Sequence, residues 1–136
     1  MNLDFHYKNT NPIFTIKQTG ETPVLQFSIF NQTDMVKHGF STRLGGVSTG
    51  IYASMNLGQS RGDDPEKVQQ NYRIIADTIG VSTEWMVCSD QTHTTNVKVV
   101  TKEDAGKGLL HPKDYQDIDG LITNVPGLCL VTYYAD

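Results

Sequence analysis

Two clusters of polar residues in this 136-residue chain have the types and the spacing to do chemistry. In the first cluster, Gln91 and His93 are separated by a single residue. In an extended segment such residues project to the same face, so an amide and an imidazole would line one pocket. A neutral imidazole is a good ligand for zinc, but a catalytic zinc site takes three protein ligands and a water. His93 is therefore a candidate metal ligand that needs partners.

The other possible metal ligands of the chain do not have a metal-binding spacing. Cys88 precedes His93 at an odd separation, which places two side chains on opposite faces of a strand unless a turn at Ser89-Asp90 intervenes. His38 and His111 are candidates by residue type alone. No pair follows a pattern such as C-x-x-C or H-x-x-x-H. We therefore do not expect this chain to form a three-ligand site by itself.

The second cluster combines a hydroxyl and a guanidinium beside a glycine pair. The separation of two between Ser41 and Arg43 puts both side chains on one face of a strand, just before Gly45-Gly46. Glycine lets backbone amides approach an anion, and a planar guanidinium binds phosphate through two parallel hydrogen bonds. The segment lacks the lysine and the spacing of a Walker loop. A surface ion pair is the structural alternative for Arg43.

Further polar residues have both structural and functional interpretations. Asn56 could bind a polar ligand or cap a turn before Gly58. Asp119 precedes a glycine, as in an ordinary turn, and together with Asp114 and Asp117 it lacks the EF-hand pattern, which favours a solvated loop over a calcium site. No Gly-x-Ser-x-Gly nucleophile elbow is present.

Short β-strands are the elements expected to carry these residues. Leu25, Phe27 and Ile29 alternate with polar residues and predict a half-buried strand with these three side chains on its buried face. Residues 1–22 have turn signals and predict irregular structure, and residues 102–118 predict a polar loop. Further strands are predicted at 36–43, 85–89, 96–101, 120–123 and 128–134.

One helix is predicted over residues 65–79. Asp63 or Asp64 can cap it, Pro65 suits the first helical position, and Glu66 interacts favourably with the helix dipole. Gly80 is a natural stop. The apolar stripe expected to face the core consists of Val68, Tyr72, Ile75 and Ile79.

Composition narrows the class of protein. Many strands with one clear helix predict an α+β or mixed α/β fold, and the length suits a single domain. The net charge of −4 and the scattered basic residues disfavour a nucleic-acid partner. The sequence has neither a signal peptide nor an apolar stretch of the ~20 residues that a membrane span needs, so we expect a cytoplasmic protein without membrane contact. Cys88 and Cys129 are then expected to be reduced, buried thiols.

Five segments, taken in order, resemble the YfiH-like family, which is also called the laccase-domain or multicopper polyphenol oxidase family. They are His38-Gly-Phe-Ser-Thr-Arg-Leu-Gly-Gly-Val-Ser48, Met55-Asn-Leu-Gly58, Gln91-Thr92-His93, Asp119-Gly-Leu-Ile-Thr123 and the apolar run that ends at Ala135-Asp136. Family members are about twice as long. The resemblance implies that residues 1–136 are the N-terminal portion of one domain, a layered αββα-type sandwich, without the half that carries the remaining metal ligands, a Cys and a His.

Members of the family are interpreted as purine nucleoside phosphorylases. The resemblance therefore implies phosphate and adenosine, inosine, guanosine or methylthioadenosine as substrates, accompanying adenosine deaminase activity, and a zinc cofactor with copper as the alternative. It also implies the roles of individual residues: His93 as metal ligand and catalytic residue, Arg43 as catalytic and phosphate-binding residue, Ser41, Asn56 and Gln91 as substrate-binding residues, and Asp119 and Asp136 as residues that orient a ligand.

Two alternatives stand beside this interpretation. The older family label implies a copper polyphenol oxidase, but a blue-copper laccase needs more ligands than four His and two Cys provide. The chain could instead be an inactive structural fragment that assembles with a copy of itself or with the missing half. The β-rich run 128–134 would then be the contact, because an unpaired strand edge recruits another chain.

Overall fold

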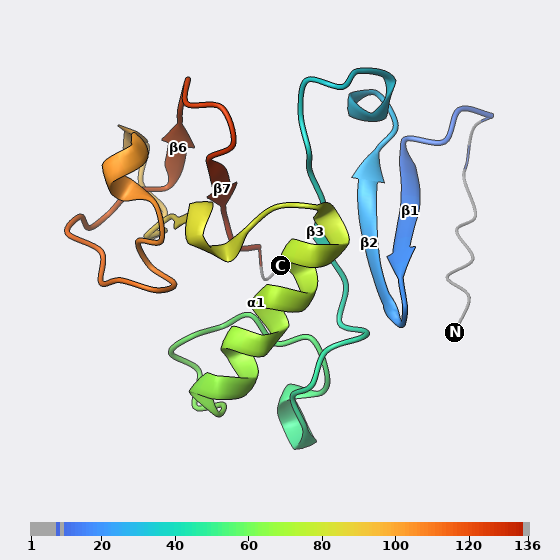
Figure 1. The fold of residues 1–136 in the computed structure, drawn as a ribbon, viewed down its shortest axis with the longest axis horizontal. Coiled ribbons are helices and arrows are strands. Elements are labelled where there is room, and N and C mark those ends of the chain that lie inside the picture. Colours follow the sequence, from blue (N-terminus) through green and yellow to red (C-terminus); the bar gives the residue numbers. More distant parts are fainter. Residues whose placement is uncertain (1–7, 9, 135–136) are drawn as a thin grey trace. The chain divides into compact units, whose positions relative to one another are not determined.

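The computed structural model describes residue 8 and residues 10–134. These residues form two compact units, of which the first ends at Ile79 and the second begins at Gly80. The described part of the chain contains one α-helix and three small sheets of two or three strands (Figure 1). This content agrees with the predicted mixed α/β class.

The first unit begins with a β-hairpin that the sequence analysis missed. Strand β1 (Phe14–Thr19) pairs antiparallel with β2 (Thr22–Phe27), and Gly20 in the turn has a φ of +58° (Figure 1). The prediction of irregular structure through residue 22 is therefore wrong. The signal in β1 is weak because all its residues except Phe14 are exposed, so the alternation of apolar and polar residues is incomplete.

The buried face of β2 also differs from the prediction. Val24 is fully buried at 0% exposure on a strand that packs against the helix 65–79, whereas Ile29 lies beyond the strand and is 67% exposed. The strand thus starts earlier than expected, and the face with Leu25 and Phe27 is the more exposed one. A shift of one residue moves every side chain of a strand to the other face.

Strand β3 (Phe40–Ser41) is the only part of the predicted strand 36–43 that forms ladder pairs, with β2. Side chains replace the ladder just before it. The Gln26 Nε2 atom donates a hydrogen bond to the His38 carbonyl (2.8 Å), and the Phe27 N–H donates to the His38 Nε2 atom (2.7 Å).

Helix α1 (Pro65–Ile79) has the predicted bounds. The Asp64 carboxylate caps it by accepting a hydrogen bond from the Glu66 N–H (3.0 Å), and Gly80 follows with a φ of +84°. The whole predicted stripe is buried, and α1 packs against β1 and β2. The helix also buries three residues outside the stripe, Asn71, Ala76 and Thr78.

The second unit contains two parallel strand pairs. Strand β4 (Met86–Cys88) pairs with β7 (Cys129–Val131), and β5 (Val97–Val99) pairs with β6 (Gly120–Ile122). All four lie within predicted strands but are shorter at both ends or at one. The predicted polar loop 102–118 contains a short 3-10 helix (Lys102–Asp104), and within it Lys107 bridges Asp104 (2.8 Å) and Asp114 (2.9 Å).

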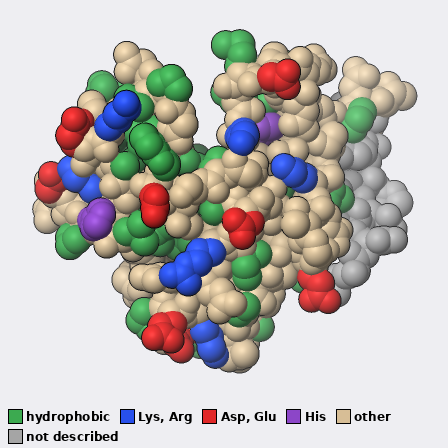
Figure 2. Space-filling model, viewed as in Figure 1, with side chains coloured by type: hydrophobic (Ala, Val, Ile, Leu, Met, Phe, Trp, Pro, Cys, Tyr) green, Lys and Arg blue, Asp and Glu red, His purple; other side chains and the backbone are tan. Residues whose placement is uncertain are grey.

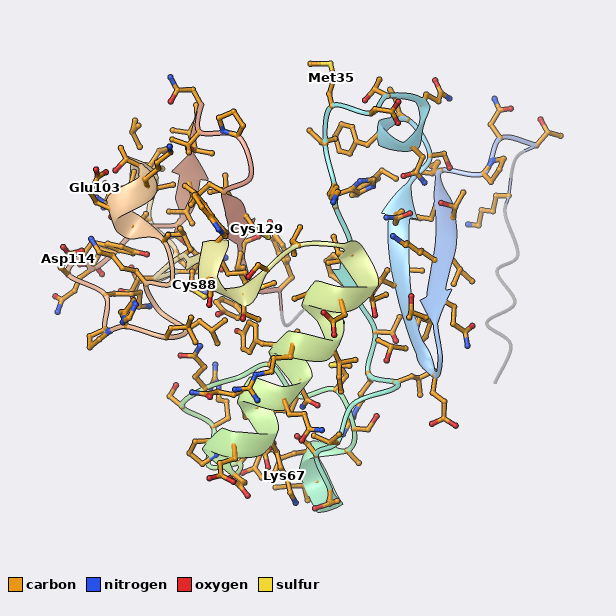
Figure 3. The ribbon with its side chains drawn as sticks, in the orientation of Figure 1. Met35, Lys67, Cys88, Glu103, Asp114 and Cys129 are labelled. Atoms are coloured by element: carbon orange, nitrogen blue, oxygen red, sulfur yellow. The ribbon has the colours of Figure 1, made fainter. Side chains whose placement is uncertain are left out.

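Both cysteines are free thiols on neighbouring strands, Cys88 on β4 and Cys129 on β7 (Figure 3). Cys88 is buried and Cys129 is half-buried. Burial raises the pKa of both thiols. Neither is therefore an activated nucleophile in this structure.

Charged side chains are mixed on the surface. On the face shown in Figure 2, Lys and Arg side chains lie interspersed with Asp and Glu. Among the described residues, no helix has the length and apolar character required to cross a membrane.

Candidate functional site

The loop between β4 and β5 wraps around the carboxylate of Asp119, which directly precedes β6. The carboxylate accepts hydrogen bonds from the backbone N–H groups of Thr92 (3.1 Å), His93 (2.9 Å) and Thr94 (2.9 Å). The Thr94 hydroxyl donates another one (2.9 Å). These bonds, with that of the Thr94 N–H the largest contribution, lower the pKa of Asp119 to about 2. Asp119 is thus an ionised anchor for the segment that carries His93.

A second aspartate, Asp117, also forms hydrogen bonds with the same loop. The Thr92 hydroxyl donates to the Asp117 carboxylate (2.8 Å), and the Asn96 amide donates to the Asp117 carbonyl (2.8 Å). His93 itself has a φ of +65°, in the left-handed region that non-glycine residues rarely adopt. Such a conformation persists only where surrounding contacts impose it. The exposed imidazole therefore projects from an ordered loop.

The prediction that Gln91 and His93 lie on one face of an extended segment is wrong. The left-handed backbone at His93 breaks the alternation of side chains, and Gln91 bonds elsewhere. Its Oε1 atom accepts from the Ser89 hydroxyl (2.9 Å) and the Tyr133 N–H (2.6 Å), while its Nε2 atom donates to the Tyr133 carbonyl (3.0 Å). Gln91 thus ties the His93 loop to the segment after β7. Asp136 lies outside the described residues.

The residues around His93 do not form a metal site by themselves in the described part of the chain. No three His, Cys, Asp or Glu residues come together there as a metal ion would require. His93 can supply one imidazole, since a ligand held on an ordered loop loses little freedom on binding.

An Asp119→Ala variant should release the His93 loop. The variant leaves three backbone N–H groups without their acceptor, and the left-handed conformation of His93 loses its support. We expect hydrogen exchange of the amides of residues 92–94 to accelerate by about tenfold or more. Asp114→Ala is the control, because it removes only a surface ion pair with Lys107. Unchanged exchange in the Asp119 variant would show that other contacts hold the loop.

In the first unit, the loop 44–56 folds around Arg43. The guanidinium Nε atom donates to the Ala53 carbonyl (2.9 Å) and the Nη2 atom donates to the Ile51 carbonyl (3.0 Å). In return the Arg43 carbonyl accepts from the N–H of Ser54 (3.1 Å) and the N–H of Met55 (3.1 Å). Arg43 is exposed and makes no ion pair with a described residue. Two of its five N–H donors bond to described residues, and the other donors are available for an anion within the described part of the chain.

The expectation that Ser41 and Arg43 share a strand face is wrong, because β3 ends at Ser41 and Arg43 lies in the loop. Ser41 is half-buried opposite Val24.

Asn56 makes the contacts that its structural interpretation, a turn before Gly58, predicts. Its Oδ1 atom accepts from the Gly58 N–H (3.0 Å), as in an Asx turn, and its Nδ2 atom donates to the Asp63 carboxylate (3.0 Å). The substrate-binding roles of Ser41 and Asn56 stay predictions.

The glycine pair allows two backbone segments to approach closely. A Cβ atom on Gly46 would lie 2.2 Å from the Ser54 carbonyl oxygen and 2.5 Å from the Met55 Cα atom. The Gly46 N–H, which was expected to face an anion, donates to the Ser54 hydroxyl (3.2 Å). Gly46 is therefore a packing requirement of the Arg43 loop.

A Gly46→Ala variant is expected to lose about 3 kcal/mol of unfolding free energy, because a backbone clash of this size forces the loop apart. The control is Gly50→Ala, where an added Cβ has open space and only the φ of +64° costs about 1 kcal/mol. Denaturant melts of the two variants measure the difference. Equal losses would contradict the close approach at Gly46.

A buried polar group that was not predicted from the sequence lies beside this loop. Asn71 of α1 has 0% exposure, and its carboxamide forms hydrogen bonds with the loop. The loop also bonds to the residue before Asp64, since the Ser48 hydroxyl donates to the Asp63 carboxylate (2.6 Å). The one available signal was a polar residue next to Tyr72 on the apolar side of the helix.

Comparison with known proteins places this chain in a family. The model of the family described as multi-copper polyphenol oxidoreductase laccase matches residues 37–136, a range that includes every predicted site residue. A purine nucleoside phosphorylase of Corynebacterium glutamicum is 39% identical over 104 residues, which are 74% of this chain and 39% of that protein. The purine nucleoside phosphorylase YlmD of Geobacillus stearothermophilus is 36% identical over 102 residues, 72% of this chain and 36% of that protein.

Solved structures of YfiH and YlmD also match this chain. The crystal structure of Bacillus licheniformis YfiH, a hypothetical protein, matches 83% of this chain and 42% of its own with a TM-score of 0.75 and 32% identity. The crystal structure of G. stearothermophilus YlmD matches 91% of this chain and 45% of its own with a TM-score of 0.73 and 31% identity. The chain thus spans less than half the length of these relatives. It belongs to the YfiH/YlmD-like laccase-domain family.

Proposed function

We propose that this chain provides part of the active site of a purine nucleoside phosphorylase. The substrates would be phosphate and a purine nucleoside, namely adenosine, inosine, guanosine or methylthioadenosine, and the same site would deaminate adenosine. The observation that supports the proposal is the similarity, at 39% and 36% identity, to two relatives that carry the name purine nucleoside phosphorylase.

Arg43 would bind the phosphate. Two of its N–H donors hold the loop 44–56, so the plane of the guanidinium is set before a ligand arrives. The remaining donors can bind phosphate oxygens and place one of them for attack on the sugar carbon, where the transition state is oxocarbenium-like. Ser41, Asn56 and Gln91 would contact the nucleoside.

His93 would be the contribution of this chain to a zinc site, with copper as the alternative ion. A neutral imidazole fits a zinc ion, and the ordered loop around Asp119 would orient it. When bound, zinc makes hydroxide available near neutral pH, which deamination requires. The other ligands would come from outside the described residues, and Asp136 would help to orient one of them.

A complete domain of this type would be a layered αββα sandwich of which residues 1–136 are the N-terminal portion. Strand β7 has β4 on one side and no strand on its other side among the described residues, and Leu130 is 37% exposed. Parallel sheets are normally larger and covered on both faces. We therefore propose the β7 edge as the contact to the complementary half, or to a second copy when that half is absent.

A chimera can test the proposal. In it, this chain is fused to the part of G. stearothermophilus YlmD that the chain does not match. The chimera is expected to release hypoxanthine from inosine only when phosphate is present, while the 136-residue chain alone is expected to be inactive. A chimera that is folded and binds zinc but releases no base would contradict the proposal.

A second candidate function is the oxidation of phenols with copper, which the description of the matching family model favours. The same chimera, loaded with copper and given a phenolic dye, distinguishes the oxidase from the phosphorylase. Brisk oxidation of the dye without phosphate-dependent release of base would favour the oxidase.

A further inference from the structure

We propose that Asn71 is a positioning residue that holds Arg43 ready for an anion. The inference rests on the proposed role of Arg43 in phosphate binding. Asn71 lies in the second turn of α1, and its side-chain hydrogen bonds to described residues go to the loop and not to Arg43 itself. It acts through the loop 44–56.

The carboxamide of Asn71 joins the two ends of this loop. Its Oδ1 atom accepts a hydrogen bond from the Val47 N–H (2.8 Å). Its Nδ2 atom donates to the Ser48 hydroxyl (2.9 Å), the Asn56 carbonyl (2.8 Å) and, more weakly, the Ser54 carbonyl (3.3 Å). Asn71 is completely buried at 0% exposure. A buried amide is stable only when its polar atoms are bonded, so the loop and the side chain need each other.

Ser54 connects Asn71 to Arg43. The Ser54 carbonyl accepts from Asn71, while the Ser54 N–H (3.1 Å) and hydroxyl (3.0 Å) donate to the Arg43 carbonyl. The neighbouring Ala53 carbonyl accepts from the Arg43 guanidinium (2.9 Å). A continuous series of direct contacts therefore runs from the helix interior to both ends of Arg43.

Two further side chains, those of Asp63 and Lys67, fasten the loop to the start of α1. The Asp63 carboxylate accepts from Ser48 (2.6 Å) and Asn56 (3.0 Å), and these bonds lower the pKa of Asp63. Lys67, in the first turn of α1 (Figure 3), donates to the Thr49 hydroxyl (3.0 Å). Asp63 and Asn71 thus both contact the two ends of the loop, and of the residues Asp63, Lys67 and Asn71 it is Asn71 that also bonds the Ser54 carbonyl beside Arg43's partner Ala53.

This arrangement has a chemical benefit. A free arginine side chain loses considerable rotamer freedom when it closes on an anion, and that loss weakens binding. An Arg43 that is already held at Ile51 and Ala53 has lost much of this freedom in advance. Without Asn71 the loop would open, and Arg43 would behave like an ordinary surface arginine.

Side-chain NMR of the 136-residue chain tests the inference directly. The chain has three arginines, and Arg61 and Arg73 are exposed internal references. In the wild type, the Arg43 Nε–H should exchange more slowly than those of Arg61 and Arg73. In an Asn71→Ala variant its exchange should accelerate by about tenfold or more, because loss of a buried hydrogen-bond network costs enough for such a change.

Two variants separate positioning from general stability. Thr78→Val removes another buried polar group of α1. Among the described residues the Thr78 hydroxyl bonds to the Ile74 carbonyl within the helix, so this variant should leave Arg43 protected. Asn71→Asp keeps the acceptor for Val47 but removes the donors to Ser54 and Asn56, so it should also expose Arg43. Folded Asn71 variants in which Arg43 stays protected would overturn the inference.

If the Asn71 variants do not fold, hydrogen exchange in the wild type tests the positioning of Arg43 by Asn71. The Val47 N–H and the Arg43 Nε–H should then exchange through the same opening, with the same dependence on denaturant. Clearly different dependences would overturn the inference. Inorganic phosphate, added to the wild type, should shift the Arg43 signal and not that of Arg73. If it does not, the phosphate role of Arg43 fails while the positioning by Asn71 stands.

Discussion

A His93→Ala variant of the chimera is expected to lose its bound zinc, and with it deamination and most phosphorolysis. A catalytic zinc site takes three protein ligands, so the loss of one removes a third of the protein's donors. Changes to residues that merely orient a ligand already weaken metal affinity by about 10- to 100-fold, so we expect the loss of the ligand itself to exceed 100-fold. Metal content after gel filtration and the two reaction rates measure the effect.

The matched control for this variant is His111→Ala, since His111 is also an exposed histidine of the second unit. The control should retain zinc and both activities. A His93→Ala chimera that keeps stoichiometric zinc would show that His93 is not a ligand. In that case the ordered loop around Asp119 would serve another purpose.

Replacing Arg43 should leave zinc bound and weaken the use of phosphate, whereas replacing His93 should remove zinc. Loss of a charge-assisted hydrogen bond pair to phosphate predicts an increase of about 10- to 100-fold in the KM for phosphate in Arg43→Ala. Arg43→Lys should not restore it, because one ammonium cannot bond the Ile51 and Ala53 carbonyls and also present a planar fork.

The control for Arg43 is Arg73→Ala on the exposed side of α1. Thermal melts belong to the experiment, since Arg43→Ala also removes two hydrogen bonds that hold the loop 44–56. A phosphate KM that stays at the wild-type value in Arg43→Ala would assign phosphate binding to other residues. A loss of zinc in the same variant would mean that Arg43 supports the metal site as well.

The sequence predicted the elements whose signals are local. Helix α1 has the predicted bounds because Asp64, Pro65 and Gly80 mark its ends and its apolar stripe has the period of a helix. The strands β4 to β7 lie where β-branched and apolar runs occur. Their ends could not be predicted, since a strand ends where its partner stops pairing, and that partner is distant in the sequence.

The geometry of the candidate site depends on contacts between distant residues and was therefore beyond prediction. The left-handed conformation of His93 is imposed by Asp119, which is 26 residues away in the sequence. Likewise, Asn71 contacts Val47 across 24 residues, and no local pattern reveals that pair. The sequence thus indicated which residue types could do chemistry, while the structure shows how the two loops that carry them are held.

We propose above all that this chain helps to catalyse phosphorolysis of a purine nucleoside. Incubation of the chimera with inosine and isotopically labelled phosphate tests it most directly, with the sugar product followed by phosphorus NMR. We expect equal amounts of hypoxanthine and ribose 1-phosphate, with the label in the sugar phosphate, and no release of base without phosphate. Hypoxanthine formed together with free ribose, or no release of base by a folded chimera with bound zinc, would contradict it.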